Sequence, residues 1–288
     1  MLNYDDVKQI HIELSSYCNS ACPSCPRNVD GGIVHPELVL HSMSLDDFKK
    51  ILSTDLLKQL EFINICGNYG DPIMCKDMLD IVRYIKENNN GIRLAIHTNG
   101  GVRSIKFWTD LGNILFTMPN ANVIFAIDGL EDTNHLYRIG VNWTRLMDNV
   151  KAFIQAGGPA IWDFLIFNHN EHQIEEAKNL AKKLGFKKLF NSPAHGFNYN
   201  GKMRVVDKNG KFLRTISPSA RSARPANSNV FDSIDYNITV DDINHRYSQV
   251  RESVINKNHN YYHLQQEKFS STDSIEIKNC MAIQYSEI

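Results

Sequence analysis

Short apolar runs alternate with longer amphipathic segments up to about residue 191 of the chain. The β-branched runs predict strands at residues 8–14, 61–66, 92–97, 122–127, 161–167 and 188–190. Between them, apolar residues recur at the spacing of helices that bury one face, as in the segments that start at Met78, Leu146 and Ile174. Strands that alternate with helices indicate a parallel sheet, which places the chain in the α/β class.

Local signals set some of the boundaries. Ser44 precedes two aspartates, a combination that caps a helix and complements its amino-terminal dipole. Gly157 and Gly158 are expected to end the helix that contains Met147, because glycine adopts the left-handed terminal conformation. After residue 195 the regular pattern fades into Gly-, Ser-, Asn- and Pro-rich sequence. We therefore predict two domains, 1–194 and 195–288, the second a smaller irregular α+β extension.

Composition and charge narrow the class of protein. The chain has 288 residues, of which 42% are hydrophobic and 22% charged, as in ordinary globular proteins. A net charge of -1 argues against a general nucleic-acid or membrane-surface binder. The segment 202–224 is a local exception, with seven Lys or Arg residues against Asp207 alone. It predicts either a solvated basic loop or a docking surface for an acidic partner.

No targeting or membrane segment is evident in the sequence. The first residues lack the basic start and apolar core of a signal peptide. No stretch approaches the ~18 apolar residues of a transmembrane helix. We therefore expect a cytoplasmic protein in reducing surroundings, where clustered cysteines more often bind metal than form disulfides. Cys66 and Cys75 stand apart from the cluster and are expected to be buried, inert thiols.

Three cysteines within eight residues, Cys18, Cys22 and Cys25, carry the strongest chemical signal. Their C-x3-C-x2-C spacing lets one loop place three thiolates around a metal centre without an obvious fourth ligand. A structural zinc site normally has four protein ligands, and most iron-sulfur clusters have four cysteines. The loop therefore predicts an open cluster, and an incomplete zinc site is the alternative.

Three further unusual segments follow predicted strands. Residues 67–72 read Gly-Asn-Tyr-Gly-Asp-Pro after the second strand, Thr98-Asn99-Gly100 follow the third, and Asp128-Gly129 follow the fourth. Functional groups of parallel β/α barrels gather at the carboxyl ends of the strands, so these segments and the cysteine loop should share one rim. Ordinary Gly/Pro and Asn-Gly turns are the alternative interpretation of the first two.

These four motifs, in this order, resemble the radical S-adenosylmethionine (SAM) enzymes, and more narrowly the members with SPASM or twitch C-terminal extensions. The likeness covers about residues 8–191. It implies a partial (β/α)6 TIM-like barrel and a [4Fe-4S] cluster on Cys18, Cys22 and Cys25. It further implies that SAM binds the remaining iron and is cleaved reductively to a 5'-deoxyadenosyl radical, while the protein orients and tunes the cofactor.

The resemblance also implies a set of SAM contacts. Asp71 stands where the family has glutamate and is expected to accept from the methionine ammonium, and Arg138 is a candidate for the SAM carboxylate. Ala126 replaces a serine of the family pattern. Ser24 stands where the family often has an aromatic residue near the adenine, and Phe167 either supplies that contact or belongs to the core. The candidate cofactor-binding residues are Tyr17, Ser24, Gly67, Asn68, Tyr69, Gly70, Asp71, Thr98, Asn99, Asp128, Arg138 and Phe167.

The implied partners are a peptide, protein or small-molecule substrate and a reductant such as flavodoxin or ferredoxin. The basic segment leaves a nucleotide or RNA substrate open. Asp128, His195 and Tyr199 are candidate general acids, Asp128 being the residue assigned a catalytic role. Two alternatives are a non-catalytic iron-sulfur or zinc protein and a barrel that binds SAM without cleaving it.

Cys280 resembles the first ligand of an auxiliary cluster in the SPASM and twitch extensions. Only eight residues follow it, and none of them is cysteine. One thiolate cannot hold a second cluster, so we expect no auxiliary cluster in this chain alone. The leading interpretation is a truncated extension; a partner that supplies ligands and an auxiliary cluster that was lost are the alternatives.

Overall fold

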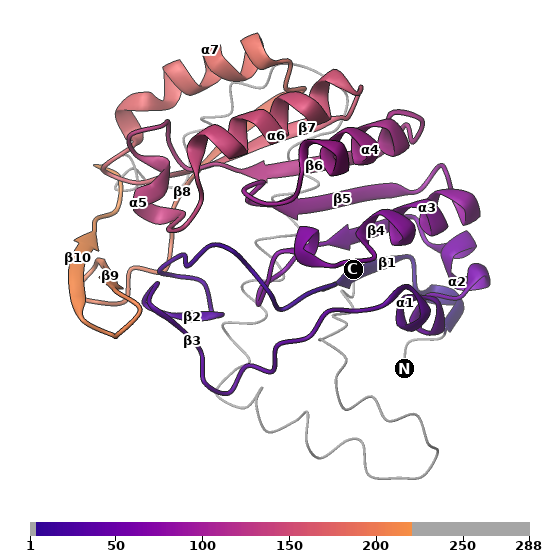
Figure 1. The fold of residues 1–288 in the computed structure, drawn as a ribbon, viewed down its shortest axis with the longest axis horizontal. Coiled ribbons are helices and arrows are strands. Elements are labelled where there is room, and N and C mark those ends of the chain that lie inside the picture. Colours follow the sequence, from indigo (N-terminus) through magenta and orange to yellow (C-terminus); the bar gives the residue numbers. More distant parts are fainter. Residues whose placement is uncertain (1–3, 221–288) are drawn as a thin grey trace. The chain divides into compact units, whose positions relative to one another are not determined.

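Six parallel strands form one sheet in the computed structural model, which describes residues 4–220 (Figure 1). In spatial order the strands are β1 Gln9–Ile12, β4 Phe62–Ile65, β5 Arg93–Thr98, β6 Ala121–Ala126, β7 Ala160–Ile166 and β8 Lys188–Pro193. Each neighbouring pair is parallel. All six predicted strands are confirmed, and the α/β class and partial barrel with them.

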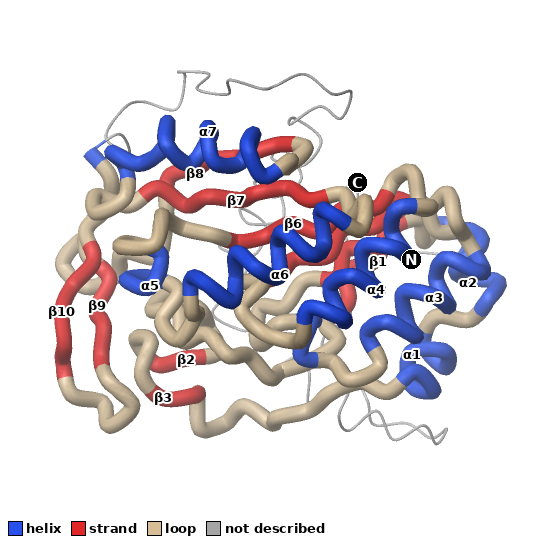
Figure 2. Tube along the Cα trace, turned by 45° about the horizontal axis from the view of Figure 1, so that its top comes forward, coloured by secondary structure: helices blue, strands red, loops and turns tan. Residues whose placement is uncertain are grey.

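The helices that cover the sheet lie on one of its faces (Figures 1 and 2). The α-helices are α1 Leu45–Ile51, α2 Thr54–Gln59, α3 Met78–Asn88, α4 Ile105–Phe116, α5 Asn134–Tyr137, α6 Trp143–Gln155 and α7 Ile174–Leu184. Short 3-10 turns occur at η1 Tyr4–Asp6, η2 Pro72–Met74 and η3 Glu171–Gln173. None of the helices within residues 4–220 is long and apolar enough to cross a membrane.

The predicted helix boundaries are explained by local contacts. The Ser44 side chain accepts a hydrogen bond from the backbone N–H of Asp47 at 3.1 Å and caps α1. Gly157 has a φ of +82° directly after α6, a conformation that L side chains rarely adopt. Both boundary predictions are therefore confirmed.

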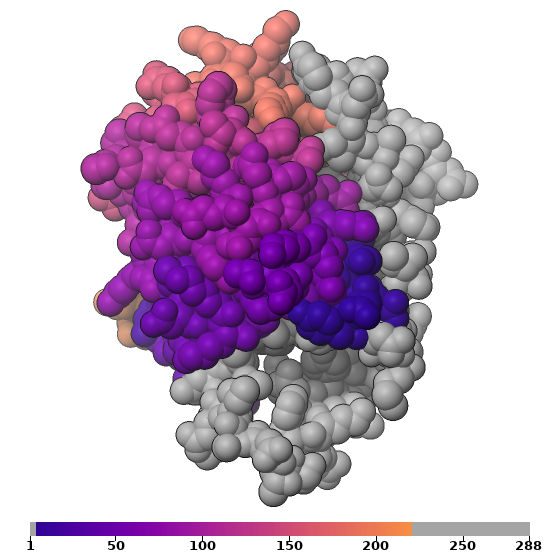
Figure 3. All heavy atoms as spheres, turned by 90° about the vertical axis from the view of Figure 1, so that its right-hand side faces the viewer, coloured from indigo at the N-terminus to yellow at the C-terminus, as the bar shows by residue number. Residues whose placement is uncertain are grey.

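The two faces of the sheet differ in chemistry because strand side chains alternate. On β7, Trp162 and Phe164 are fully buried on the helix-covered face, whereas Asp163 points to the opposite, inner face. Trp108, Phe125 and Phe153 add a ring cluster on the helix side, with centroids 5.3–6.2 Å apart. This apolar face forms the main core. Figure 3 shows the atoms of the first β/α units, in indigo and purple, packed against those of the following β/α units, in magenta and pink.

Two small antiparallel hairpins complete the described fold. One pairs β2 Asn28–Val29 with β3 Ile33–Val34, and the other pairs β9 Met203–Val206 with β10 Phe212–Ile216. The second hairpin lies where the sequence pattern predicts irregular structure, and its apolar run at 203–206 is a regular strand. The division at residue 194 stays a prediction. Arg221, Arg224 and Cys280 lie outside the described residues.

Gly112 on α4 provides a test of the helix packing. A Cβ at this position would lie 2.6 Å from the Phe153 carbonyl oxygen and 2.8 Å from the Ala156 Cβ on the chain segment that includes α6. Alanine stabilises an exposed helix position by about 1 kcal/mol relative to glycine. We expect the opposite here, with Gly112→Ala lowering the free energy of unfolding by about 1–3 kcal/mol through overpacking. Chemical denaturation measures it, and exposed Asn113→Ala is the control; a stabilising Gly112→Ala would contradict the packing.

Candidate active site

The carboxylate of Asp71 joins the loops that follow β4 and β5. Its Oδ1 accepts a hydrogen bond from Ile73 N at 3.0 Å. Its Oδ2 accepts from Thr98 Oγ1 at 3.0 Å, from Asn99 N at 2.9 Å and from Asn99 Nδ2 at 2.7 Å. Asp71 is 4% exposed, so these four bonds replace its hydration. The predicted contact of Asp71 with the methionine ammonium stays a prediction.

Asn99 extends this network to the cysteine loop. Its Nδ2 donates to Asn19 Oδ1 at 2.9 Å and approaches Cys18 Sγ at 3.6 Å. The Asp71 N–H also donates to the Tyr17 carbonyl at 2.8 Å, while the Tyr17 side chain is 40% exposed. Three of the four predicted rim motifs are thus in direct contact.

Hydrogen-bonding groups lie beside the sulfur atoms of Cys18 and Cys22. The Ser20 N–H donates to Cys18 Sγ at 3.3 Å, and Arg138 Nη1 approaches Cys22 Sγ at 3.5 Å. The Ser20 hydroxyl lies 3.1 Å from Cys22 Sγ. Such donors stabilise the negative charge that thiolates carry when they ligate an iron-sulfur cluster. The residues present therefore fit the implied group.

Protonation of the thiols is coupled to metal binding. Burial raises the pKa of Cys18 to about 12 and that of Cys25 to about 11. In the metal-free loop Cys18 and Cys25 are therefore thiols, and their ligation to a metal must release protons. Within residues 4–220 no three His, Cys, Asp or Glu side chains gather closely enough to hold a single metal ion.

Two glycines let the loop at 67–72 lie against the chain that follows β1. A Cβ on Gly70 would lie 1.9 Å from the Ser15 carbonyl oxygen, and one on Gly67 would lie 2.0 Å from the Gly70 carbonyl oxygen. Only glycine fits such close backbone approaches. The Asn68 carbonyl then lies 3.4 Å from Cys25 Sγ, and Tyr69 N donates to Glu13 Oε2 at 3.2 Å. The Asn68 carbonyl is thereby placed as an acceptor beside Cys25.

Arg138 and Asp128 form a buried ion pair next to the cysteine loop. Arg138 Nε lies 2.5 Å from Asp128 Oδ2, and Leu165 N donates to Asp128 Oδ1 at 2.7 Å. The Asp128 side chain is fully buried. The predicted acid role of Asp128 and carboxylate contact of Arg138 stay predictions; the structure adds an ion pair that connects the fourth motif to Cys22.

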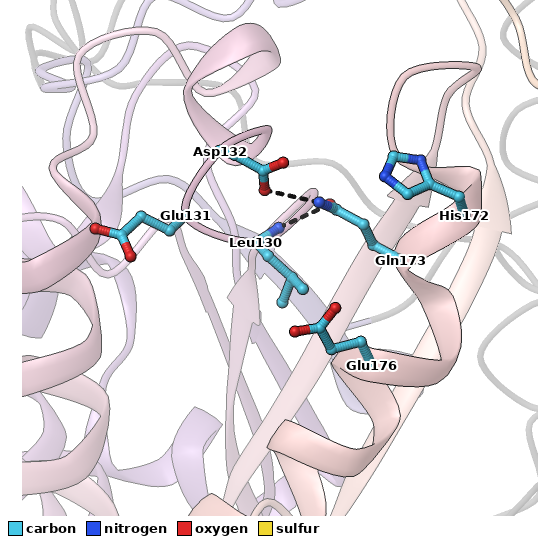
Figure 4. A pocket seen from close by; sticks show the side chains of 6 residues that line it. All are labelled: Leu130, Glu131, Asp132, His172, Gln173 and Glu176. Carbon is cyan, nitrogen blue, oxygen red and sulfur yellow. Dashed lines mark hydrogen bonds between the residues drawn. The ribbon is translucent and has the colours of Figure 1, made fainter.

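The turn after Asp128 is held on its outer side by Gln173, at a surface pocket shown in Figure 4. Gln173 Nε2 donates to Asp132 Oδ1 at 2.7 Å, and the Leu130 N–H donates to Gln173 Oε1 at 3.1 Å. Glu131 and Glu176 also line this pocket. These contacts fix the loop that presents Asp128.

Ser24 lies beside an aromatic pair formed by Tyr137 and Phe167. Its hydroxyl lies 2.7 Å from the Tyr137 hydroxyl, and the Tyr137 ring lies 4.6 Å from that of Phe167. Phe167 is fully buried, in a second small core with Cys22. Phe167 is therefore a core residue, which is one of its two predicted roles. The aromatic residue that contacts Ser24 is Tyr137.

The remaining sequence candidates differ in their exposure to solvent. His195 and Tyr199 are both exposed, the latter by 53%. Cys75 is buried as predicted, whereas the prediction that Cys66 is buried is wrong, because it is half-buried at the end of β4. Cys66 lies on the inner face of the sheet, which the main core does not fill.

Asp163 is a residue of the inner face that the sequence analysis missed. It pairs in register with Ala126 on β6, near the carboxyl ends of the strands. Among the described residues, no hydrogen bond or ion pair engages its carboxylate. Burial and the nearby Asp128 raise its pKa to about 6, which the Arg138 charge opposes. A charged residue within the apolar run 161–167 was the available signal.

Replacement of Arg138 tests the buried ion pair. Arg138→Met leaves the Asp128 carboxylate buried without its cation, and we expect a loss of about 3–5 kcal/mol in the free energy of unfolding. The double variant Asp128→Asn/Arg138→Met should recover part of that loss, because no charge is then left unpaired. Urea denaturation of the metal-free protein measures both. Strictly additive losses would contradict the pair.

The raised pKa of Asp163 predicts a pH-dependent stability. Between about pH 4 and pH 6 the folded protein keeps a proton that the unfolded chain releases, so Asp163 destabilises the fold increasingly as the pH rises. The free energy of unfolding of Asp163→Asn relative to wild type should therefore increase by about 2 kcal/mol from pH 4 to pH 7. The exposed Asp55→Asn is the control. A pH-independent difference would show that Asp163 ionises normally.

Comparison with known proteins places these features in context. A model of the radical SAM superfamily matches residues 12–184. Over 175 residues the chain is 24% identical to a GTP 3',8-cyclase of Klebsiella pneumoniae, covering 58% of this chain and 49% of the relative. Over 115 residues it is 27% identical to the FeMo cofactor biosynthesis protein NifB of Methanocaldococcus infernus, covering 38% and 37%. The chain spans less than half the length of these curated relatives.

Solved structures share the fold. Streptococcus suis SuiB bound to S-adenosylmethionine matches with a TM-score of 0.52 and 18% identity, covering 66% of this chain and 42% of SuiB. SuiB bound to the precursor peptide SuiA matches with a TM-score of 0.51 and 17% identity, covering 65% and 40%. Because the family model begins at strand β1, which leads into the cysteine loop, and extends over more than half of the chain, the chain belongs to the radical SAM superfamily.

Proposed function

We propose that Cys18, Cys22 and Cys25 hold a [4Fe-4S] cluster at which this enzyme cleaves SAM reductively. The observation that carries the proposal is the set of hydrogen-bond donors around the sulfur atoms of Cys18 and Cys22, from Ser20, Asn99 and Arg138. When bound, the cluster and SAM supply the chemistry, in which one electron divides SAM into methionine and a 5'-deoxyadenosyl radical. The protein supplies binding, orientation and electrostatics.

The chain's own residues prepare the position beside the cluster. Asp71 fixes the loop at 67–72 against Thr98 and Asn99, so its carbonyl groups are oriented before a ligand binds. The Asn68 carbonyl beside Cys25 is an acceptor for the methionine ammonium. The Arg138 cation, held by Asp128, balances thiolate charge at Cys22. These roles extend the predicted SAM contacts.

For the substrate we favour a peptide or protein. Asp163 places a carboxylate on the inner face of the sheet, and the nearby Arg138 cation is already paired with Asp128. A carboxylate beside a triphosphate costs free energy, whereas an amine or amide of a peptide donates hydrogen bonds to it.

A nucleotide substrate is the second candidate, because the matched relatives include a GTP 3',8-cyclase. The narrower SPASM or twitch assignment draws no support from the relatives, and Cys280 lies outside the described residues. We therefore do not extend the proposal to an auxiliary cluster. GTP-dependent product formation without any effect of added peptides would favour the second candidate.

The radical function has a direct test. After anaerobic reconstitution with iron and sulfide and reduction by dithionite, the protein should release 5'-deoxyadenosine from SAM, as measured by chromatography. Cys22→Ala should abolish this release and the iron-sulfur absorbance. Cys75→Ala is the matched control, because its buried thiol binds the Met43 carbonyl and not the site.

Two results would oppose the proposal in different ways. Stoichiometric zinc with no iron-sulfur signal would indicate a zinc protein. Normal SAM binding without cleavage under strong reduction would indicate a barrel that has lost the chemistry.

A further inference from the structure

The β9–β10 hairpin forms a layer directly over the cysteine loop. Met203 and Val205 of β9 and Ile216 of β10 are buried in one cluster with Cys22, and Cys25 packs against it. A Cβ on Gly196, in the segment before the hairpin, would lie 2.9 Å from the Ser24 Cβ. One side of the hairpin therefore packs against the segment that contains the cysteines.

The same hairpin also exposes basic and apolar side chains to solvent. Residues 202–214 hold five Lys or Arg residues and one carboxylate, Asp207, whose Oδ1 accepts from the N–H groups of Asn209 and Lys211. Lys202, Lys208 and Lys211 are exposed. Phe212 and Leu213 are also 51% and 52% exposed. Exposed apolar groups rimmed by charge mark interaction surfaces.

The β2–β3 hairpin continues this surface. It lies beside β9–β10 in Figures 1 and 2. The Val206 N–H donates to the Asp30 carbonyl at 3.0 Å, and Arg204 pairs with Asp30 at 3.1 Å. Val29 and Ile33 are 38% and 44% exposed. We define the hairpin surface as Val29, Ile33, Lys202, Lys208, Lys211, Phe212 and Leu213.

Position and charge together indicate what this surface binds. A partner on the outside of the hairpin is separated from Cys22 and Cys25 by the side chains of one β layer, a distance on the order of 10 Å. The cationic rim attracts an acidic protein and raises its association rate. The exposed apolar side chains supply the small contact area of a transient complex.

We propose that the hairpin surface docks an acidic one-electron carrier protein, which reduces the site held by the three cysteines. This proposal rests on the proposed function, since only a redox site needs such a donor. In each encounter the carrier loses one electron and the cysteine-held site gains it. No bond forms between the two proteins, and the carrier leaves in its oxidised form.

Charge reversal tests the proposal, with a bacterial flavodoxin as the acidic probe. Binding of oxidised flavodoxin to the full-length chain is measured by calorimetry at low and high ionic strength. We expect Lys208→Glu/Lys211→Glu to weaken binding by about tenfold or more at low ionic strength. The same variant should slow flavodoxin-driven SAM cleavage and leave dithionite-driven cleavage unchanged.

The controls separate this proposal from the proposed function. Lys182→Glu/Lys183→Glu on α7 makes the same charge change on exposed side chains away from the hairpin, and it should leave binding unchanged. Phe212→Ser/Leu213→Ser should weaken the binding that persists at high ionic strength. Equal binding by wild type and the Lys208/Lys211 variant would overturn the docking site. So would a chain dimer that this variant dissociates, since the surface would then be a self-interface. Failure of dithionite-driven cleavage in wild type would instead refute the radical function.

Discussion

The described site depends on one buried carboxylate. Asp71 accepts four hydrogen bonds, one from its own loop and three from the residues that end β5 and begin the following turn. A buried carboxylate left without such donors is costly, so the two loops are stable only when they lie together. Asn99 transmits this constraint to Asn19 and Cys18. The geometry of the cysteine loop is therefore tied to the contact between Asp71 and Asn99.

A second polar pair supports the other side of the loop. Arg138 binds Asp128, which receives the Leu165 N–H, and the same guanidinium approaches Cys22. The loops that follow β1, β4, β5 and β6 thus meet around the cysteines. The pocket beside Gln173 is lined by other residues, and Gln173 itself holds the turn that follows Asp128.

Much of this arrangement is encoded locally and was readable from the sequence. The six strands, the cap at Ser44 and the rim position of the motifs follow from periodicity and turn chemistry, which act over a few residues. The contact of Arg138 with Cys22 and the packing of the β9–β10 hairpin over Cys22 were not predictable, because both join segments far apart in the chain. Asp163 could have been noticed, since a lone acid in an apolar strand needs an explanation. Its raised pKa required the folded environment.

The hairpin over the cysteines also has a consequence for biogenesis. Cys18 to Cys25 lie near the start of the chain, but Met203, Val205 and Ile216 lie almost two hundred residues later. A ribosome delivers the amino-terminal part first, and domains begin to fold in that order. The cysteine loop is therefore translated before the residues that cover it. During that interval the thiols are reachable by whatever machinery delivers iron and sulfide, and strands β9 and β10 cover the loop once they are made.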